Sequence, residues 1–236
     1  MSVKIKELLE ALLDFSFPSH CMSCCRAVKG GALICSECNK NIEKISVKTC
    51  IKCGMPLKKC ECYKYVYHFL GIIAPFFNEG IAQRGLYRLK FTGAKPIVSY
   101  YGDAMCECYR KKYSDVKFDA ITFVPMNLIK GLKHGYNQAE WLAEYVAEKL
   151  EIPLYKNLLK RKPLSKVQHK RKGISNRFLN AYKSYERTGS INGGTILLID
   201  DIKTTGASLD ACAKELLYAG ANEVYCLTAL LSDKNS

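Results

Sequence analysis

The chain has 236 residues, and 36 Lys and Arg against 22 Asp and Glu give it a formal net charge of +14 at pH 7. This length accommodates one α/β domain with a small appendage, and the positive charge favours a polyanionic ligand. No apolar run of the sequence reaches the length of a transmembrane helix, which excludes membrane insertion, and we expect a cytoplasmic protein.

The first 18 residues carry an apolar stripe at helical spacing, formed by Ile5, Leu8, Leu9, Leu12 and Leu13. Charged residues such as Lys6 and Glu10 interrupt the stripe. A secretory signal needs a continuous apolar centre, so residues 1–18 are predicted to form a short packing helix instead.

Eight of the thirteen cysteines follow one another in close pairs: Cys21 and Cys24, Cys35 and Cys38, Cys50 and Cys53, Cys60 and Cys62. Two Cys-x-x-Cys turns supply the four thiolates of a tetrahedral zinc site, and disulfides are rare in the cytoplasm. The spacing therefore predicts one or two zinc ions. We assign the first two pairs to one site and the last two to another, although an interleaved pairing fits the same spacing.

Residues 19–63 hold too few large apolar side chains to form a core, so metal binding must supply their folding energy. They are predicted to form a double zinc-ribbon-like module. A zinc ion with four cysteine ligands has no open position for water or substrate, which makes this zinc structural. Such a module can also dock nucleic acid or protein, and its spacing does not show which.

Residues 64–236 alternate between strand and helix patterns. A β-rich segment over 65–77 precedes predicted helices over 79–91 and 94–112, a strand over 118–125 and an amphipathic helix over 138–150. Alternation of this kind indicates a parallel sheet with crossover helices. The fold class is therefore α/β, with a mostly parallel sheet flanked by helices behind a small Cys-rich zinc-ribbon module.

A basic segment follows, because residues 152–185 contain ten Lys and Arg and no acidic residue. Three interpretations are open: a lid over a charged ligand, a contact to DNA, or a solvated loop. We favour a lid formed by Lys160 to Lys172, with DNA contact as an addition to that role.

Residues 195–208 are the most informative stretch. Ile196 to Ile199 form an apolar run typical of a central strand, and Asp200 and Asp201 follow at its carboxyl end, where open α/β sheets bind ligands. As hydrogen-bond acceptors, the two carboxylates suit adjacent sugar hydroxyls. The residues that follow, 203–208, supply backbone N–H groups, hydroxyls and a helix N-terminus, all of which favour a bound phosphate. The predicted phosphate loop consists of Lys203, Thr204, Thr205, Gly206, Ala207 and Ser208.

This stretch resembles the phosphoribosyl pyrophosphate (PRPP) signature of type I phosphoribosyltransferases: four hydrophobic residues, two acids and a Thr-Thr-Gly loop. The resemblance implies a type I phosphoribosyltransferase fold. It also implies Mg²⁺ bound with PRPP, Asp200 and Asp201 as catalytic residues at the ribose hydroxyls, and residues 203–208 around the 5′-phosphate.

The chain as a whole resembles the ComF family, a competence-associated group of phosphoribosyltransferase-like proteins. Val124-Pro125, the run from Gly135 to Ala139, the basic residues between 161 and 182, and the cysteine pairs carry this resemblance. It implies a link to DNA uptake during natural competence. Lys130, Lys133 and His134 stand where the family usually has arginines, and we expect them to face the pyrophosphate with less bidentate contact.

Two functions follow from these resemblances. One is a Mg²⁺- and PRPP-dependent glycosyltransferase for pentosyl transfer, and the sequence does not identify its acceptor. Some phosphoribosyltransferases carry an Asp in the phosphate loop where this chain has Thr204, which leaves His134 and His169 as candidate general bases. The alternative is a noncatalytic PRPP sensor that binds single-stranded DNA or proteins of the DNA-uptake and recombination machinery.

Overall fold

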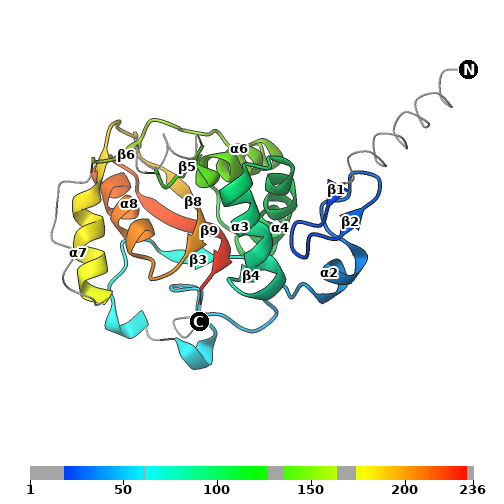
Figure 1. The fold of residues 1–236 in the computed structure, drawn as a ribbon. Helices are drawn as coiled ribbons and strands as arrows, with labels where there is room; N and C mark the ends of the chain where they lie inside the picture. Colours follow the sequence, from blue (N-terminus) through cyan, green and yellow to red (C-terminus); the bar gives the residue numbers. More distant parts are fainter. Residues whose placement is uncertain (1–18, 61, 127–135, 164–173, 233–236) are drawn as a thin grey trace, which may run out of the picture.

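The computed structural model describes residues 19–60, 62–126, 136–163 and 174–232. Within them, a parallel five-stranded sheet forms the centre of the molecule (Figure 1). Its strand order is β3 (Gly71–Ile73), β9 (Glu223–Leu231), β8 (Thr195–Lys203) and β5 (Ala120–Phe123), and β4 (Phe76–Phe77) pairs with the end of β9.

The two central strands are buried on both faces, which explains their unbroken apolar runs. β8 pairs in parallel with β9 from Thr195 and Glu223 onward and with β5 on its other side. Successive residues alternate between two cores, so Leu197 and Ile199 face one side of the sheet while Ile196 and Leu198 face the other.

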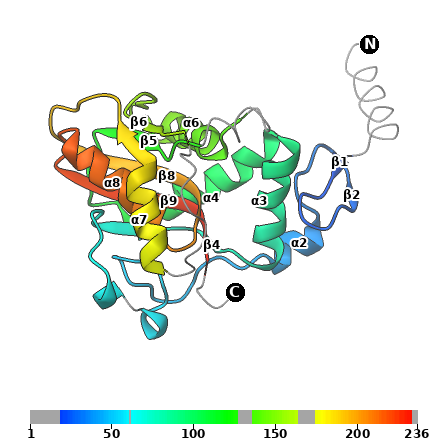
Figure 2. The same ribbon diagram turned by 60° about the vertical axis from the view of Figure 1, so that its left-hand side comes forward.

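Helices cover both faces of the sheet, and Figures 1 and 2 agree on their placement. On one face lie α3 (Gly80–Thr92), α4 (Pro96–Lys112) and α6 (Gln138–Leu150). On the other face lie α7 (Ile174–Ser184) and α8 (Ala207–Tyr218), beside an antiparallel pair formed by β6 (Leu159–Arg161) and β7 (Tyr185–Arg187). The fold class expected from the sequence is therefore the one observed.

Most predicted elements are present with small shifts. The helices expected over 79–91, 94–112 and 138–150 are α3, α4 and α6, and the strand expected over 118–125 is β5. The strand expected at Ile196 to Ile199 is longer, because β8 continues pairing with β9 as far as Lys203. Consequently Asp200, Asp201 and Lys203 belong to the strand itself. Among the described residues, no helix has the length and hydrophobicity of a membrane span.

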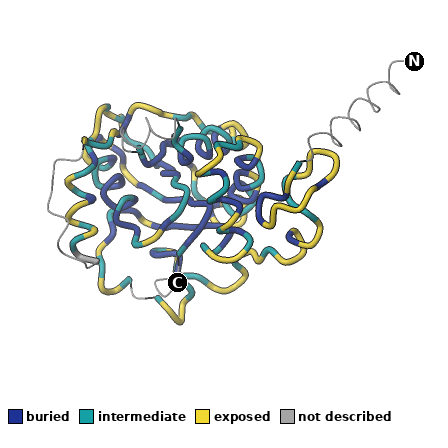
Figure 3. Tube along the Cα trace, in the orientation of Figure 1, coloured by how far each residue is buried: buried dark blue, intermediate teal, exposed yellow. Residues whose placement is uncertain are grey.

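The N-terminal module contains little regular structure. It comprises β1 (Ser19–His20), β2 (Ala27–Val28), α2 (Ser36–Asn41) and two short 3-10 turns, η1 (Leu57–Lys59) and η2 (Cys62–Lys64). Much of its early part is exposed, whereas the sheet is buried (Figure 3). The helix predicted for residues 1–18 lies outside the described residues, and the boundary predicted between 63 and 64 stays a prediction.

Candidate functional site

The first two cysteine pairs come together in one cluster, which we call cluster one: Cys21, Cys24, Cys35 and Cys38, whose sulfur atoms all lie within 4.8 Å of one another. The Sγ atoms of Cys24 and Cys35 are 3.7 Å apart. The backbone N–H of Cys38 donates to Cys35 Sγ at 3.4 Å, which is typical of a knuckle whose thiolate accepts main-chain hydrogen bonds.

The last two pairs form cluster two: Cys50, Cys53, Cys60 and Cys62, again with all sulfur atoms within 4.8 Å. The Sγ of Cys53 lies 3.6 Å from that of Cys60, and the Sγ of Cys50 lies 3.7 Å from that of Cys62. Zinc–sulfur bonds of about 2.3 Å in a tetrahedron place sulfur atoms about 3.8 Å apart, so these separations fit zinc. The pairs are therefore consecutive, and the interleaved pairing is not the one observed.

The electrostatics of both clusters favour a divalent cation. In cluster two, burial raises the pKa of Cys50, but the backbone N–H group of Cys53 and other donors lower it to about 7. The pKa of Cys62 is raised to about 12, first by its hydrogen bond with Cys60 and then by burial. One thiolate thus forms readily while its neighbours resist ionisation. A zinc ion would remove this repulsion, because it binds all four as thiolates.

Asp200 and Asp201 lie near the carboxyl end of β8, as the sequence predicts. The N–H of Asp201 donates to Asp200 Oδ1 at 2.9 Å, and the N–H of Ile202 donates to Asp201 Oδ1 at 2.7 Å. Burial raises the pKa of Asp200 well above its usual value, and the nearby charge of Asp201 raises it further. The positive charge of Lys90, in the last turn of α3, offsets part of this shift.

The predicted phosphate loop connects β8 to α8 through a sharp turn. Gly206 is the N-cap of α8 and adopts φ = 84°, a left-handed conformation that suits glycine. Thr205 accepts at its Oγ1 from the N–H of Ala207 at 3.4 Å, Thr204 is exposed, and Ser208 belongs to the first turn of the helix. The N–H groups at the start of that turn and the helix dipole favour an anion here.

Lys203 lies in a different place from the rest of its predicted loop. Its side chain is only 3 % exposed, and its Nζ donates to the carbonyl oxygen of Cys53 at 2.9 Å. Its side chain thus contacts cluster two, and its part in phosphate binding stays a prediction.

Sequence reasoning missed a buried acidic residue behind the phosphate loop. Asp210 is fully buried in the first turn of α8 and accepts hydrogen bonds from the backbone N–H of His68 at 2.5 Å and from the hydroxyl of Tyr182. His68 Nδ1 lies 3.2 Å from Asp210 Oδ2. These bonds join the segment before β3, helix α7 and helix α8. The sequence holds one signal that could have revealed this residue: Asp210 is an acid within the otherwise apolar stripe of α8.

Arg161 and Tyr185 also lie beside the phosphate loop, although they are distant in the sequence. The guanidinium of Arg161 lies over the ring of Tyr185, 5.3 Å from its centroid, and Tyr185 interacts with Ser208. Arg161 Nε is buried and has no hydrogen-bond partner among the described residues. Pairing of β6 with β7 brings these side chains to the loop, and sequence patterns do not reveal that pairing.

Lys130, Lys133 and His134, which we predicted to face a pyrophosphate, lie outside the described residues, as does most of the predicted lid. The described residue nearest to that loop is Tyr136, which anchors the end of α3. Its hydroxyl donates to the carbonyl oxygens of Leu89 at 3.2 Å and Lys90 at 3.0 Å, and its ring stacks on Trp141. The chain after the predicted pyrophosphate loop is thereby tied to the helix that carries Lys90.

Comparisons with known proteins agree with this arrangement. A family profile described as a double zinc ribbon domain matches residues 12–65. The chain is 25% identical over 197 residues to "Competence protein ComFC" of Bacillus subtilis, covering 79% of each chain. It is 26% identical over 231 residues to "Competence protein F" of Haemophilus influenzae, covering 87% of this chain and 92% of that one.

Two solved structures are similar to part of this chain. A purine phosphoribosyltransferase of Pyrococcus horikoshii is 15% identical, with 57% of this chain and 84% of that chain covered and a TM-score of 0.37. An adenine phosphoribosyltransferase of Saccharomyces cerevisiae is 14% identical, with 63% and 75% covered and a TM-score of 0.39.

The cysteine clusters, the parallel sheet with helices on both faces, and the acidic pair before the loop at the N-terminus of α8 all lie where the family resemblance places them. The curated relatives extend over most of the chain. The chain is therefore similar to the ComF family over most of its length, and residues 12–65 match a double zinc ribbon.

Proposed function

We propose that this protein binds PRPP with Mg²⁺ and acts as a phosphoribosyltransferase-like component of DNA uptake in natural competence. The arrangement at the end of β8 carries the proposal: an acidic pair, then a turn at Gly206, then the first turn of α8. Competence is the role that the names of the curated relatives give them.

The acidic pair would hold the sugar. Asp200 and Asp201 offer acceptor oxygens to the two adjacent ribose hydroxyls. The 5′-phosphate would lie against residues 204–208, where backbone N–H groups and the helix dipole stabilise its charge. Arg161, whose buried Nε has no hydrogen-bond partner among the described residues, would add a cation beside this loop.

The opposite end of the ligand would carry the leaving group. In the transfer, the bond between the anomeric carbon and the pyrophosphate oxygen breaks while a bond to a nucleophilic acceptor forms. Lys90 on α3, together with Lys130, Lys133 and His134, would stabilise the charge that develops on the pyrophosphate. Mg²⁺, when bound with PRPP, would neutralise part of the same charge through its oxygen ligands.

Thermal unfolding tests the ligand. PRPP with Mg²⁺ is expected to raise the melting temperature, because a ligand that binds only the native state stabilises it. The double variant Asp200→Asn and Asp201→Asn should abolish the rise. Lys130→Ala with Lys133→Ala should weaken PRPP more than ribose 5-phosphate, which lacks the pyrophosphate. Equal losses for both ligands would contradict the role given to that loop.

Turnover distinguishes an enzyme from the alternative, a noncatalytic PRPP sensor that binds DNA or protein partners. An enzyme is expected to convert PRPP, in the presence of Mg²⁺ and a cell extract, into pyrophosphate and a ribosylated product. Binding of PRPP without pyrophosphate release from any extract fraction would favour the sensor. The exposed aromatic and basic side chains that follow cluster two, such as Tyr63 and Lys64, would supply a surface for such partners.

A further inference from the structure

The side chain of Lys203 connects cluster two to the phosphate loop. Its Nζ donates to the carbonyl oxygen of Cys53 at 2.9 Å. Its Cε lies 3.5 Å from the position that a Cβ on Gly206 would occupy, and a ring carbon of Tyr67 lies 3.6 Å from the same position. The stem of a buried lysine and one aromatic ring therefore lie next to the turn at Gly206.

The carbonyl that receives Lys203 belongs to a tightly folded knuckle. The N–H of Gly54 donates to the carbonyl oxygen of Cys50 at 2.8 Å, and the N–H of Cys50 donates to the carbonyl oxygen of Met55 at 2.8 Å. Cys53 itself is 3 % exposed. A buried ammonium group is tolerated only where acceptors are fixed in place, so the position of Lys203 depends on the geometry of this knuckle.

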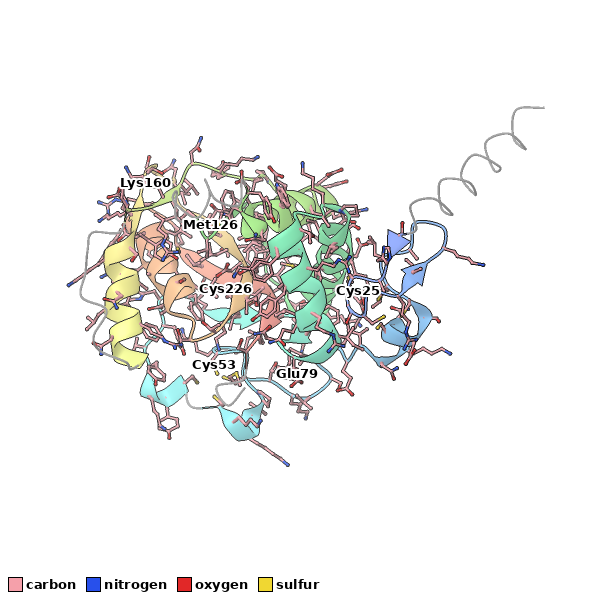
Figure 4. All side chains as sticks on the ribbon, viewed as in Figure 1. Cys25, Cys53, Glu79, Met126, Lys160 and Cys226 are labelled. Carbon is pink, nitrogen blue, oxygen red and sulfur yellow. The ribbon has the colours of Figure 1, made fainter. Side chains whose placement is uncertain are left out.

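Further contacts hold the knuckle against the sheet next to the loop. The carbonyl oxygen of Ile51 accepts from the N–H of Ile72 in β3 at 2.9 Å. Lys52 Nζ donates to the carbonyl oxygen of Phe69 at 2.6 Å. In Figure 4 the label of Cys53 marks the knuckle below the sheet, away from Cys25 in the first ribbon.

We propose that cluster two is coupled to the phosphate loop through Lys203, a positioning residue, so that zinc retention in this cluster and phosphate binding at residues 204–208 reinforce each other. The zinc fixes the Cys53 carbonyl, the carbonyl fixes Lys203, and Lys203 supports the turn at Gly206. Linkage requires the effect to be reciprocal. The proposal rests on the assignment of residues 204–208 as a phosphate site.

Cluster one supplies a matched control within the same chain. There the carbonyl oxygen of Cys21 accepts from Arg88 Nη1 at 3.2 Å, so a cation of the α/β domain again meets the carbonyl of a buried cysteine. Arg88 lies on α3, however, and touches no part of the phosphate loop in the contacts of the described residues. Phosphate binding should therefore leave zinc in cluster one unaffected.

The test is the rate at which a colorimetric chelator removes zinc from the full-length protein, with and without saturating ribose 5-phosphate and no added Mg²⁺. We expect two release phases, and ribose 5-phosphate should slow the cluster-two phase by about fivefold or more, the lower end of ordinary coupling between sites. A Cys38→Ser variant lacks an intact cluster one. It should keep the phase that ribose 5-phosphate slows, which would assign that phase to cluster two.

Two substitutions locate the coupling. Lys203→Met should retain zinc in both clusters, release cluster-two zinc faster even without ligand, and lose the protection by ribose 5-phosphate. Arg88→Met should preserve that protection. Lys203→Arg, which keeps a donor, should recover part of it, a result that a general loss of packing would not produce.

Calorimetry with ribose 5-phosphate separates this proposal from the function on which it rests. If the wild type binds ribose 5-phosphate but both release phases change equally or not at all, the coupling is refuted while the phosphate site stands. If the wild type binds neither ribose 5-phosphate nor PRPP, the proposed function fails. In that case the coupling between Lys203 and the metal is refuted as well if Lys203→Met leaves the ligand-free release rate unchanged.

Discussion

The two cysteine clusters use the same chemistry but differ in what surrounds them. Each has a buried cysteine whose carbonyl oxygen accepts from a cation of the α/β domain, Arg88 for Cys21 and Lys203 for Cys53. Cluster one packs within a small separate group that includes Val28. Cluster two belongs to the core on the α8 side of the sheet, where Cys53 and Met55 pack with strand and helix residues.

Two cysteine clusters with the same chemistry can therefore have different structural roles. Cluster one rests on α3 through Arg84 and Arg88, and its cysteines pack in their own small group. The neighbouring Met22 belongs to the core on the α3 side of the sheet. Cluster two fills part of the core beside the phosphate loop. We therefore expect loss of the first metal to remain local and loss of the second to reach the α/β domain.

The largest effect is expected from removing one ligand of each cluster. Cys53→Ser should lower the free energy of unfolding of the α/β domain by about 3 kcal/mol or more, because loss of a structural metal site is among the most damaging single changes. Cys38→Ser should remove one zinc ion and leave the main unfolding transition near its original temperature. Calorimetry and elemental zinc analysis measure both, and equal damage from the two variants would contradict the comparison.

Two glycines test how each cluster docks. A Cβ on Gly54, where φ is 74°, would lie 2.9 Å from Leu231 Cδ1, and Gly54→Ala should cost about 2 kcal/mol from backbone strain and crowding. A Cβ on Gly85, in α3, would lie 2.5 Å from the Tyr101 hydroxyl and 3.2 Å from Met22 Cγ. Because Gly85→Ala also gains helix propensity, its net cost should be about 1 kcal/mol. Urea denaturation measures the free energy of unfolding of both variants. A larger loss in Gly85→Ala than in Gly54→Ala would contradict the expectation that cluster two is the more closely packed against the α/β domain.

A smaller effect, and a stabilising one, is expected from replacing Asp200 in β8, the strand that also carries Lys203. The pKa of Asp200 is raised in the folded state. Its contribution to the free energy of unfolding is therefore most favourable below the unfolded-state pKa, and stability is lost as the pH rises through the folded-state pKa. Asp200→Asn should therefore stabilise the protein at pH 7, because the amide does not ionise. The gain should vanish near pH 3.5. A gain that is independent of pH would show that charge is not its cause.

The smallest effect is expected at the surface of cluster one. Arg26 forms an ion pair with Glu37, and both side chains are more than half exposed. Solvent and salt screen such a pair, so Arg26→Ala should leave the melting temperature and the zinc content unchanged. A clear loss of zinc from cluster one in this variant would show that its stability depends on surface charge, which separates it further from cluster two.

The sequence alone identified the elements whose patterns are local. The spacing of the cysteine pairs predicted two metal clusters, and helical periodicity predicted α3, α4 and α6 to within a few residues. The apolar run at Ile196 to Ile199 predicted a strand buried on both faces, followed by acids at its carboxyl end. These features depend on neighbouring residues and on elementary geometry, so a linear pattern is enough to reveal them.

Only the tertiary structure decided what the charged side chains do. Lys203 belongs to the phosphate loop that the sequence predicts, and the fold places its side chain in the interior, where it meets Cys53, 150 residues earlier in the chain. Asp210 likewise gains its role from His68 and Tyr182, which arrive from two other segments. A buried charge must find partners wherever the fold supplies them, and that choice depends on long-range packing that no local pattern contains.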